Sequence, residues 1–265
     1  GFEFIGFLPT KAMERDTAVQ ALQSRTHALV LLEAPLRIEA VAKALAVLGE
    51  RQITIGRELT KQFEEIATLA AAEANPDIEF ALIDDAADAD FNGTPDFDNT
   101  KPIVFNTAQA AFLVGYAAAS YSKSGIVATW GGMNFPTVTI FMDGFAQGVA
   151  YHNEQNGTAV SVLGYDLASP DTATFTGGFE ANDVAKSTAQ NFIDQGADIL
   201  LPVGGPIYQS AVAAITDSGK DIALIGVDAD LFETDPSTQD IIFTSIRKGI
   251  KSATSAVVAD AAAGN

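Results

Sequence analysis

The chain has 265 residues, a length that suits one large domain or two lobes. Its 34 acidic and 15 basic residues give a net charge of -19, which opposes the phosphate neutralisation that nucleic-acid binding requires. The chain has no cysteine and two histidines, which excludes disulfides and cysteine nucleophiles and argues against a metal site. The longest apolar run, around 110–119, is far shorter than the roughly 18 residues needed to cross a bilayer, so we expect no membrane insertion.

Short apolar strands and helices alternate along the whole chain. The predicted strands are residues 2–8, 28–33, 52–56, 79–83, 102–105, 126–130, 159–163, 199–203, 222–227 and 241–245. The predicted helices are residues 11–24, 37–48, 60–74, 108–122, 141–153, 182–195, 207–218 and 248–262. This alternation is typical of parallel sheets that are covered by helices on both faces.

Roughly ten strands are many for one such sheet, so the sequence predicts an α/β fold with two doubly wound lobes. We expect residues 1–107 and about 229–265 to form an N-terminal lobe, and residues 108–228 to form a C-terminal lobe. Ligands of open α/β sheets bind beyond the carboxyl ends of the strands. The cleft between the lobes is therefore the predicted binding site.

Charge is distributed unevenly along the chain. Residues 1–69 contain 8 basic and 9 acidic residues, whereas residues 70–265 contain 7 basic and 25 acidic residues. Two explanations remain open: the two parts have different origins, or the acidic part presents one solvated surface.

Two aspartates each follow an apolar strand. Asp84 comes after residues 80–83, and Asp228 comes after residues 223–227. A carboxylate at the end of a strand can accept two hydrogen bonds from the hydroxyl groups of a ligand. The alternative is that each aspartate caps a helix or closes an Asx turn.

An aromatic residue and a lysine are further candidates for ligand contact. Phe179 lies in a polar, glycine-containing loop, where an exposed ring would suit stacking on a planar ligand. The alternative is that the ring plugs the core beneath it. Lys248 follows a predicted strand and opens a helix, so it is either a hydrogen-bond donor to a ligand or a solvated charge.

Motifs for catalysis are absent from the sequence. It contains no GxGxxG, GxxxxGK[ST] or GxSxG segment. The glycine pairs 131–132, 177–178 and 204–205 stand at strand ends or in loops, where tight turns explain them. We therefore predict no enzymatic activity, no catalytic residue and no cofactor.

Most of the chain from about residue 76 onward resembles a known family of proteins. The segments that carry the resemblance, in chain order, are PDIEFALIDD (76–85), the long run 106–153, NFIDQGADILLPVGGP (191–206), IGVDADLF (225–232) and TSIRKGI (244–250). These segments resemble the basic membrane protein family, which comprises substrate-binding proteins of ABC transporters of the purine nucleoside receptor type.

The resemblance implies a type I periplasmic-binding fold, in which two Rossmann-like lobes hold a nucleoside between them. Carried over by motif, Phe179 would stack on the purine, and Asp228 and Asp84 would hold ribose hydroxyls. Lys248 and Gly204 would complete this inter-lobe pocket.

Residues 1 to about 69 resemble a different family. The segments FIGFLPTK (4–11), ALVLLEAPLRIEAVAKALAVLGE (28–50) and GRELTKQFEEI (56–66) are similar to the C-terminal part of ribosomal RNA small-subunit methyltransferase I, an enzyme with the tetrapyrrole methylase fold. The resemblance does not include the enzyme's N-terminal domain, which forms most of the S-adenosylmethionine site. It therefore implies no methyl transfer.

The two resemblances meet within one continuous alternation of strands and helices. The methyltransferase-like fragment would supply the first β-α-β-α-β of the N-terminal lobe. Our hypothesis from sequence is an engineered or recombined chimeric scaffold, with no catalytic activity and with weak or absent ligand binding. The first alternative is a functional purine-nucleoside-binding protein of a transporter, and the second is an S-adenosylmethionine-dependent RNA methyltransferase.

The resemblance also bears on location and partners. The family is extracytoplasmic and membrane-anchored as lipoproteins. This chain opens directly on a predicted strand, without a secretion signal or a lipid-acceptor cysteine. We expect a soluble monomer, expressed in the cytoplasm, whose partner is a purine nucleoside rather than a nucleic acid or a membrane.

Overall fold

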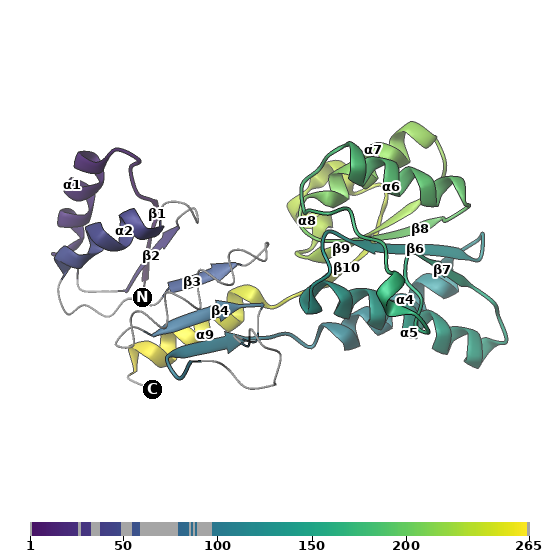
Figure 1. Cartoon of the computed structure of the whole chain (residues 1–265), viewed down its shortest axis with the longest axis horizontal. Helices are drawn as coiled ribbons and strands as arrows, with labels where there is room; N and C mark the ends of the chain where they lie inside the picture. Colours follow the sequence, from purple (N-terminus) through teal and green to yellow (C-terminus); the bar gives the residue numbers. More distant parts are fainter. Residues whose placement is uncertain are drawn as a thin grey trace.

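The computed structural model describes residues 2–25, 28–32, 38–48, 55–58, 79–84, 86, 88 and 97–263. The predicted helix 60–74 lies outside the described residues. The described elements form two groups, one built around β6–β10 with α4–α8, and the other containing β1–β5 with α1, α2 and α9 (Figure 1).

The larger group is built on a parallel sheet of five strands in the order β10-β9-β8-β6-β7. Its strands are β6 (Ile126–Gly131), β7 (Ser161–Leu163), β8 (Ile199–Val203), β9 (Ala223–Asp228) and β10 (Ile242–Arg247). The three central strands, β6, β8 and β9, are short and rich in buried apolar residues, as the predicted class of parallel sheet requires.

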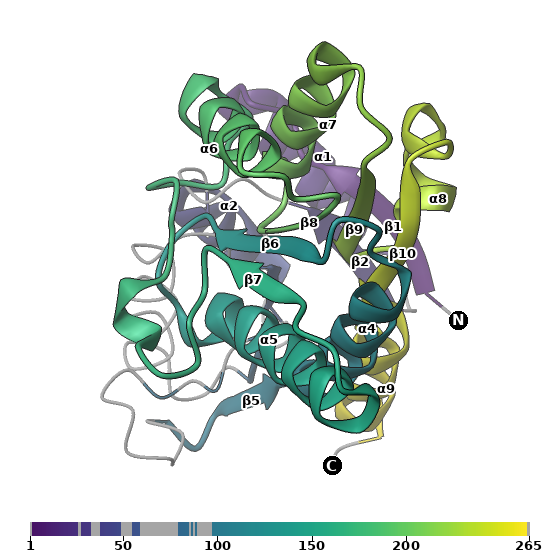
Figure 2. The same cartoon turned by 90° about the vertical axis from the view of Figure 1, so that its right-hand side faces the viewer.

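Helices cover both faces of this sheet (Figure 2). The helices on one face are α4 (Thr107–Tyr121) and α5 (Pro136–Asn156), and those on the other are α6 (Asp183–Asp194) and α7 (Ile207–Ser218). Successive residues of a strand point to opposite faces, so Val127 packs with α4 and α5, whereas Ala128 and Trp130 pack with α6 and α7.

Helix α5 begins at Pro136, five residues before the predicted start at Phe141. Proline favours the first turn of a helix, where its missing N–H has no partner to lose. The helix approaches α4 closely, because a Cβ placed on Gly148 would lie 2.0 Å from the carbonyl oxygen of Phe112. This contact fixes the position of α5 against the sheet.

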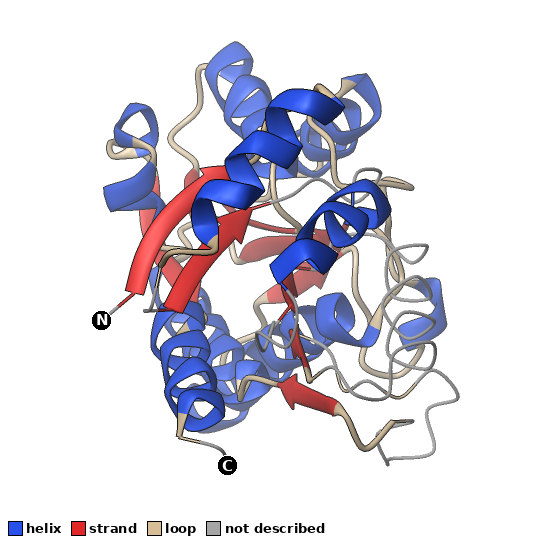
Figure 3. Cartoon of the chain, turned by 90° about the vertical axis from the view of Figure 1, so that its left-hand side faces the viewer, coloured by secondary structure: helices blue, strands red, loops and turns tan. Residues whose placement is uncertain are grey.

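The second group contains two small parallel sheets. One pairs β1 (Phe2–Phe7) with β2 (Ala28–Leu32), and the other has the order β3-β4-β5, with bounds Ile55–Glu58, Phe80–Ile83 and Thr100–Ile103. Figure 3 looks onto this end of the molecule. The helices α1 (Ala12–Leu22) and α2 (Ile38–Leu45) share a small core made of Leu8, Val19, Val41 and Leu45.

The order of these strands repeats that of the large sheet. When its strands are numbered in chain order, the large sheet has the spatial order 5-4-3-1-2. In the second group, β5-β4-β3 corresponds to the 5-4-3 part of this order, and β1-β2 corresponds to the 1-2 part. The counterpart of the β6–β8 pairing would join β1 to β3. No such pairing is present among the described residues, so the first two strands form a sheet of their own.

The chain returns to the second group after β10. Helix α9 (Ile250–Ala262) packs on β4 and β5 through Ile250, Ala253 and Val257. Strand β10 pairs with β9, so it belongs to the five-stranded sheet, although the predicted boundary near 229 would assign it to the N-terminal lobe. The division into two lobes is otherwise still a prediction.

Short helices complete the chain. They are α8 (Leu231–Thr234) and the 3-10 helices η2 (Ala46–Leu48), η3 (Pro170–Thr172) and η4 (Pro236–Thr238). In the part of the chain that the structure describes, no helix is long and apolar enough to span a membrane.

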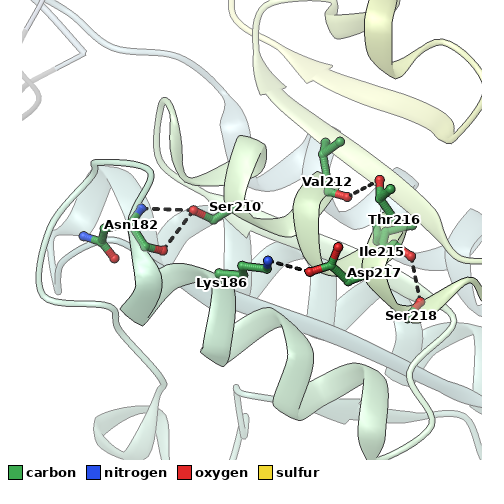
Figure 4. Close-up of polar contacts among 8 residues, drawn as sticks. All are labelled: Asn182, Lys186, Ser210, Val212, Ile215, Thr216, Asp217 and Ser218. Carbon is green, nitrogen blue, oxygen red and sulfur yellow. Dashed lines mark hydrogen bonds and ion pairs between the residues drawn. The ribbon is translucent and has the colours of Figure 1, made fainter.

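The pairing of α6 with α7 shows how polar contacts support the large group (Figure 4). Lys186 of α6 donates to Asp217 of α7 at 2.5 Å. The Ser210 hydroxyl accepts from the N–H of Asn182 and donates to its carbonyl oxygen, both at 3.1 Å. The Asn182 side chain also caps α6 by accepting from the N–H of Ala185 at 2.9 Å.

Candidate ligand-binding site

Three of the predicted site residues meet where strands of the two groups end. The ammonium group of Lys248 donates a hydrogen bond to Asp84 Oδ2 and lies 3.0 Å from Asp228 Oδ1. Its nitrogen also lies over the ring of Phe141, 4.6 Å from the ring centroid. We refer to Asp84, Phe141, Asp228 and Lys248 as the Lys248 cluster.

The strand ends place these side chains. Asp84 follows β4, Asp228 is the last residue of β9, and Lys248 follows β10. The backbone N–H of Asp84 donates to the carbonyl of Ile103 at 2.8 Å, and the N–H of Lys248 donates to the carbonyl of Asp228 at 2.9 Å. Each segment is therefore anchored to a neighbouring strand.

Both aspartates have the same unusual backbone conformation. Asp84 and Asp228 each have a φ of 65°, and they are the non-glycine residues with positive φ in the described chain. The left-handed region is uncommon for residues other than glycine, although aspartate tolerates it better than most. Such strain persists where surrounding structure holds it, and it is concentrated at ligand-binding and catalytic sites.

Lys248 is almost completely buried, with 3% of its side chain exposed. A buried ammonium requires nearby negative charge, which Asp84 and Asp228 supply, and the face of the Phe141 ring adds a further attraction. The cluster therefore contains two carboxylates and one ammonium group. Of the two explanations for Lys248 left open by the sequence, the structure excludes a solvated charge.

One oxygen of the cluster lacks a hydrogen-bond donor. Asp228 Oδ1 lies 3.0 Å from Lys248 Nζ and forms an ion pair with it, but the contact does not have the geometry of a hydrogen bond. The atom is buried, and it accepts no hydrogen bond from the described residues. A buried carboxylate oxygen that accepts no hydrogen bond is costly even within an ion pair, which makes it a strong acceptor for a donor that enters from outside the protein.

Phe179 and Gly204 lie together, but Phe179 is not an exposed stacking platform in this structure. The ring is 7% exposed and belongs to the core cluster that also contains residues of α4 and α5. A Cβ on Gly132 or on Gly204 would lie 2.4 Å from its Cδ1 atom. The two glycines thus form the surface on which the ring is buried, as in the alternative that the sequence left open.

Phe141 was not among the residues predicted for the site. Its side chain is 1% exposed, and its sequence context is that of an ordinary apolar residue in a helix. The sequence carries no local signal of its contact with Lys248, which comes from a distant strand end. Only the packing of α5 against the sheet reveals it.

A pocket of about 150 Å³ lies at the opposite, amino end of the large sheet. Several of the polar groups around it have partners within the protein: Lys123 pairs with Asp221 at 2.8 Å, and Asp198 accepts from the N–H groups of Lys123 and Ser124. Because these groups satisfy one another, we place the candidate site at the Lys248 cluster instead. Within the described residues, no group of three or more acidic or histidine side chains could hold a metal ion.

Comparison with known families identifies the chain. Residues 53–265 match the family model Bmp, described as "ABC transporter substrate-binding protein PnrA-like". The chain belongs to the Bmp family. Its similarity to Basic membrane protein A1 of Borrelia garinii subsp. bavariensis is 26% identity over 189 residues, which is 71% of this chain and 50% of that protein. The chain thus spans about half the length of the curated Bmp relatives that it matches.

The second resemblance is confirmed over a shorter stretch. Ribosomal RNA small subunit methyltransferase I of Mesorhizobium japonicum is 45% identical over 69 residues, which is 25% of this chain and 24% of that enzyme. The protein of the same name from Pseudomonas aeruginosa is 45% identical over 74 residues. The likeness is partial in both cases, so the Bmp family accounts for most of the chain.

Solved structures confirm the α/β fold class. A solute-binding protein of an ABC transporter system from Aeropyrum pernix K1 has a TM-score of 0.63 at 22% identity, covering 96% of this chain and 71% of that one. A periplasmic solute-binding protein from Actinobacillus succinogenes 130z, solved with bound D-allose, also has a TM-score of 0.63, at 14% identity, covering 98% of this chain and 89% of that one. This Bmp chain has the fold of periplasmic binding proteins.

Proposed function

We propose that this Bmp protein binds a small solute that carries several hydroxyl groups, of the purine nucleoside type, at the Lys248 cluster. The observation that carries the proposal is Asp228 Oδ1, a buried oxygen at the carboxyl end of a parallel strand that accepts no hydrogen bond from the described residues. A sugar hydroxyl would supply the missing donor. The family supports the same class of function, since substrate-binding proteins bind solutes without transforming them.

Each residue of the cluster has a distinct role in this proposal. Asp228 accepts a hydrogen bond from a ribose hydroxyl. Lys248 supplies a positive charge that offsets the repulsion between the carboxylates of Asp84 and Asp228. Asp84 is held by Lys248 and offers its carboxylate from the other sheet. Stacking of Phe179 on a purine would require the ring to leave the glycine surface, so we assign Phe179 no contact with the ligand.

Isothermal titration with adenosine, guanosine and inosine tests the proposal, with S-adenosylmethionine as the control ligand. We expect saturable heat from at least one nucleoside and none from S-adenosylmethionine. Asp228→Asn should weaken binding by roughly tenfold or more, because a hydrogen bond to a charged acceptor is replaced by one to a neutral acceptor. Asparagine also tolerates a positive φ, so this variant changes the charge without adding backbone strain.

Asp221→Asn is the matched control. It removes a carboxylate from the amino end of the same sheet, where the side chain is 89% exposed and paired with Lys123. Equal losses of affinity in both variants would show that net charge, rather than Asp228, controls binding. Heat only from S-adenosylmethionine would replace the proposal with a methyltransferase-type ligand.

A second candidate function rests on a different observation. The separation of β1 and β2 from β3–β5 falls within residues 1–69, which resemble the methyltransferase, and the Bmp match begins at residue 53, just before β3. This favours a chimeric scaffold, in which a fragment of one α/β protein replaces part of another and binding is weak or absent. A protein that unfolds cooperatively but gives no heat with any nucleoside would support it.

As a transporter component, the chain would act outside the cytoplasmic membrane and deliver its solute to a membrane permease. This role follows from the family alone. It applies to the binding candidate and not to the scaffold candidate.

A further inference from the structure

We infer that Phe141 is a positioning residue of the binding site, and that the face of its ring holds the Lys248 ammonium group between Asp84 and Asp228. The Phe141 side chain has no polar atom that could bind either carboxylate, and we assign it no contact with a ligand. Its effect on a ligand would be exerted through Lys248. The affinity part of this inference rests on the proposed function, whereas the structural part does not.

The geometry around Lys248 supports the inference. The ammonium nitrogen lies 4.6 Å from the centroid of the Phe141 ring, within the range of about 6 Å in which a ring face attracts a cation. The Lys248 side chain is 3% exposed and Phe141 is 1% exposed, so little water competes for the ammonium group. The attraction between a cation and a ring is strongest when both are desolvated.

The position of the ammonium group determines which carboxylate oxygen is left for a ligand. Lys248 donates to Asp84 Oδ2 and faces the Phe141 ring, while Asp228 Oδ1 receives its charge but no hydrogen bond. Without the ring, the ammonium group would be free to move to a position from which it also donates a hydrogen bond to Asp228 Oδ1. The acceptor that we assign to the ligand would then be occupied by the protein itself.

Helix α5 gives the ring a fixed place. Phe141 lies in the second turn of the helix, which begins at Pro136 and packs closely on α4 through Gly144 and Gly148. The ring also belongs to the main core cluster beneath the sheet. The side chain therefore holds Lys248 from a rigid element, as a site that depends on a precise geometry requires.

Phe145 provides a matched control on the same helix. It is 0% exposed and belongs to the same core cluster, and no contact of its ring with a cation is present among the described residues. Replacing either phenylalanine by leucine removes the same volume from the same core. Only the change at 141 removes the ring next to Lys248.

Nuclear magnetic resonance of the ligand-free protein tests the position of Lys248 directly. Protons above the face of an aromatic ring are shifted upfield, so we expect an upfield shift of the Lys248 Hε protons, assigned by their loss in Lys248→Arg. Phe141→Leu should abolish the shift and Phe145→Leu should retain it. An unshifted Lys248 in the unmodified chain would overturn the inference. Phe141→Met repeats the test if the leucine variant fails to fold.

Fluorinated phenylalanine at position 141 tests the electrostatic origin of the effect. One, two and three fluorine atoms weaken the ring's attraction for a cation in steps and leave its shape nearly unchanged. We expect the affinity for the best-bound nucleoside to fall in the same steps, by roughly tenfold in total. The same series at Phe145 should leave affinity unchanged.

The two measurements separate this inference from the proposed function. If no nucleoside binds the unmodified chain, the proposed function is wrong, and the Lys248 shift still decides whether Phe141 positions the lysine. If a nucleoside binds with the same affinity across the fluorinated series, Phe141 has no positioning role, although the proposed function stands.

Discussion

Lys248 donates a hydrogen bond to Asp84, 164 residues earlier in the chain. The bond joins the end of β10 in the large sheet to the end of β4 in a small sheet. It therefore connects the two groups of elements at the point where the chain passes from one to the other.

This connection should contribute to stability. Asp84→Asn leaves the Lys248 ammonium group buried with one fewer negative charge, so we expect the free energy of unfolding to fall by about 1–3 kcal/mol. Urea denaturation followed by circular dichroism measures the change.

Asp221→Asn serves as the control for this prediction as well. Its partner Lys123 is 73% exposed, and an exposed ion pair contributes little because water screens it. We expect no measurable change in the urea midpoint. If Asp221→Asn lost as much stability as Asp84→Asn, the burial of the Lys248 cluster would not explain the contribution of Asp84 to stability.

The surface beneath Phe179 should tolerate no side chain at Gly204. A Cβ there would lie 2.4 Å from the Phe179 ring, and the φ of 134° is a conformation that other residues rarely adopt. We expect Gly204→Ala to reduce the free energy of unfolding by about 2 kcal/mol or more. Thermal unfolding, followed by circular dichroism, measures the loss.

Gly178→Ala is the comparison for Gly204→Ala, because a Cβ at Gly178 meets nothing within 4 Å. This variant should unfold close to the temperature of the parent protein. The double variant Gly204→Ala, Phe179→Ala should lose less stability than the sum of the two single losses, since the steric conflict disappears with the ring. Full additivity of the two changes would contradict the contact.

Tyr165 should stay protonated well above the usual range. Burial, together with the neighbouring Asp143 carboxylate that accepts its hydroxyl hydrogen bond at 3.3 Å, raises the pKa of Tyr165 to about 12. The unfolded chain ionises near pH 10, so this contribution to stability is complete below about pH 10 and is lost as the pH rises through about 12. Ultraviolet absorbance of tyrosinate, followed during a pH titration, measures the ionisation.

The variant Tyr165→Phe tests whether the ionisation near pH 12, the late step of that titration, belongs to Tyr165. The variant should lack it and should lose stability less steeply above pH 10. Burial also raises the pKa of Tyr208, opposed by a hydrogen bond from Gln209 and reinforced by Asp235. Tyr208→Phe is therefore the second variant to compare, and an unchanged late step in Tyr165→Phe would exclude the assignment.

The start of α6 depends on the Asn182 side chain. Asn182→Ala removes the acceptor for the Ala185 N–H, and we expect a loss of about 1 kcal/mol in the free energy of unfolding. Asn182→Asp keeps an acceptor in the same place and should restore most of the stability. The backbone contacts between Asn182 and Ser210 persist in both variants, so a larger loss would point to an effect beyond the cap.

Parts of the site could be predicted from local sequence because they depend on local geometry. Asp84 and Asp228 each end an apolar strand, and parallel strands bring their carboxyl ends to one edge of a sheet. The pattern of apolar residues therefore predicted the place of these carboxylates. The same pattern predicted the α/β class, because short, mainly apolar strands between helices have few other ways to be buried.

The partners of these residues depended on the tertiary structure. The contact of Lys248 with Asp84 and Phe141, and the burial of Phe179 on Gly132 and Gly204, join positions that no spacing rule relates. The break between β1 and β3 likewise depends on pairing between segments that are distant in the chain. Local sequence sets which way a strand or a helix faces, whereas close packing in three dimensions decides which side chains meet and which oxygen is left without a donor.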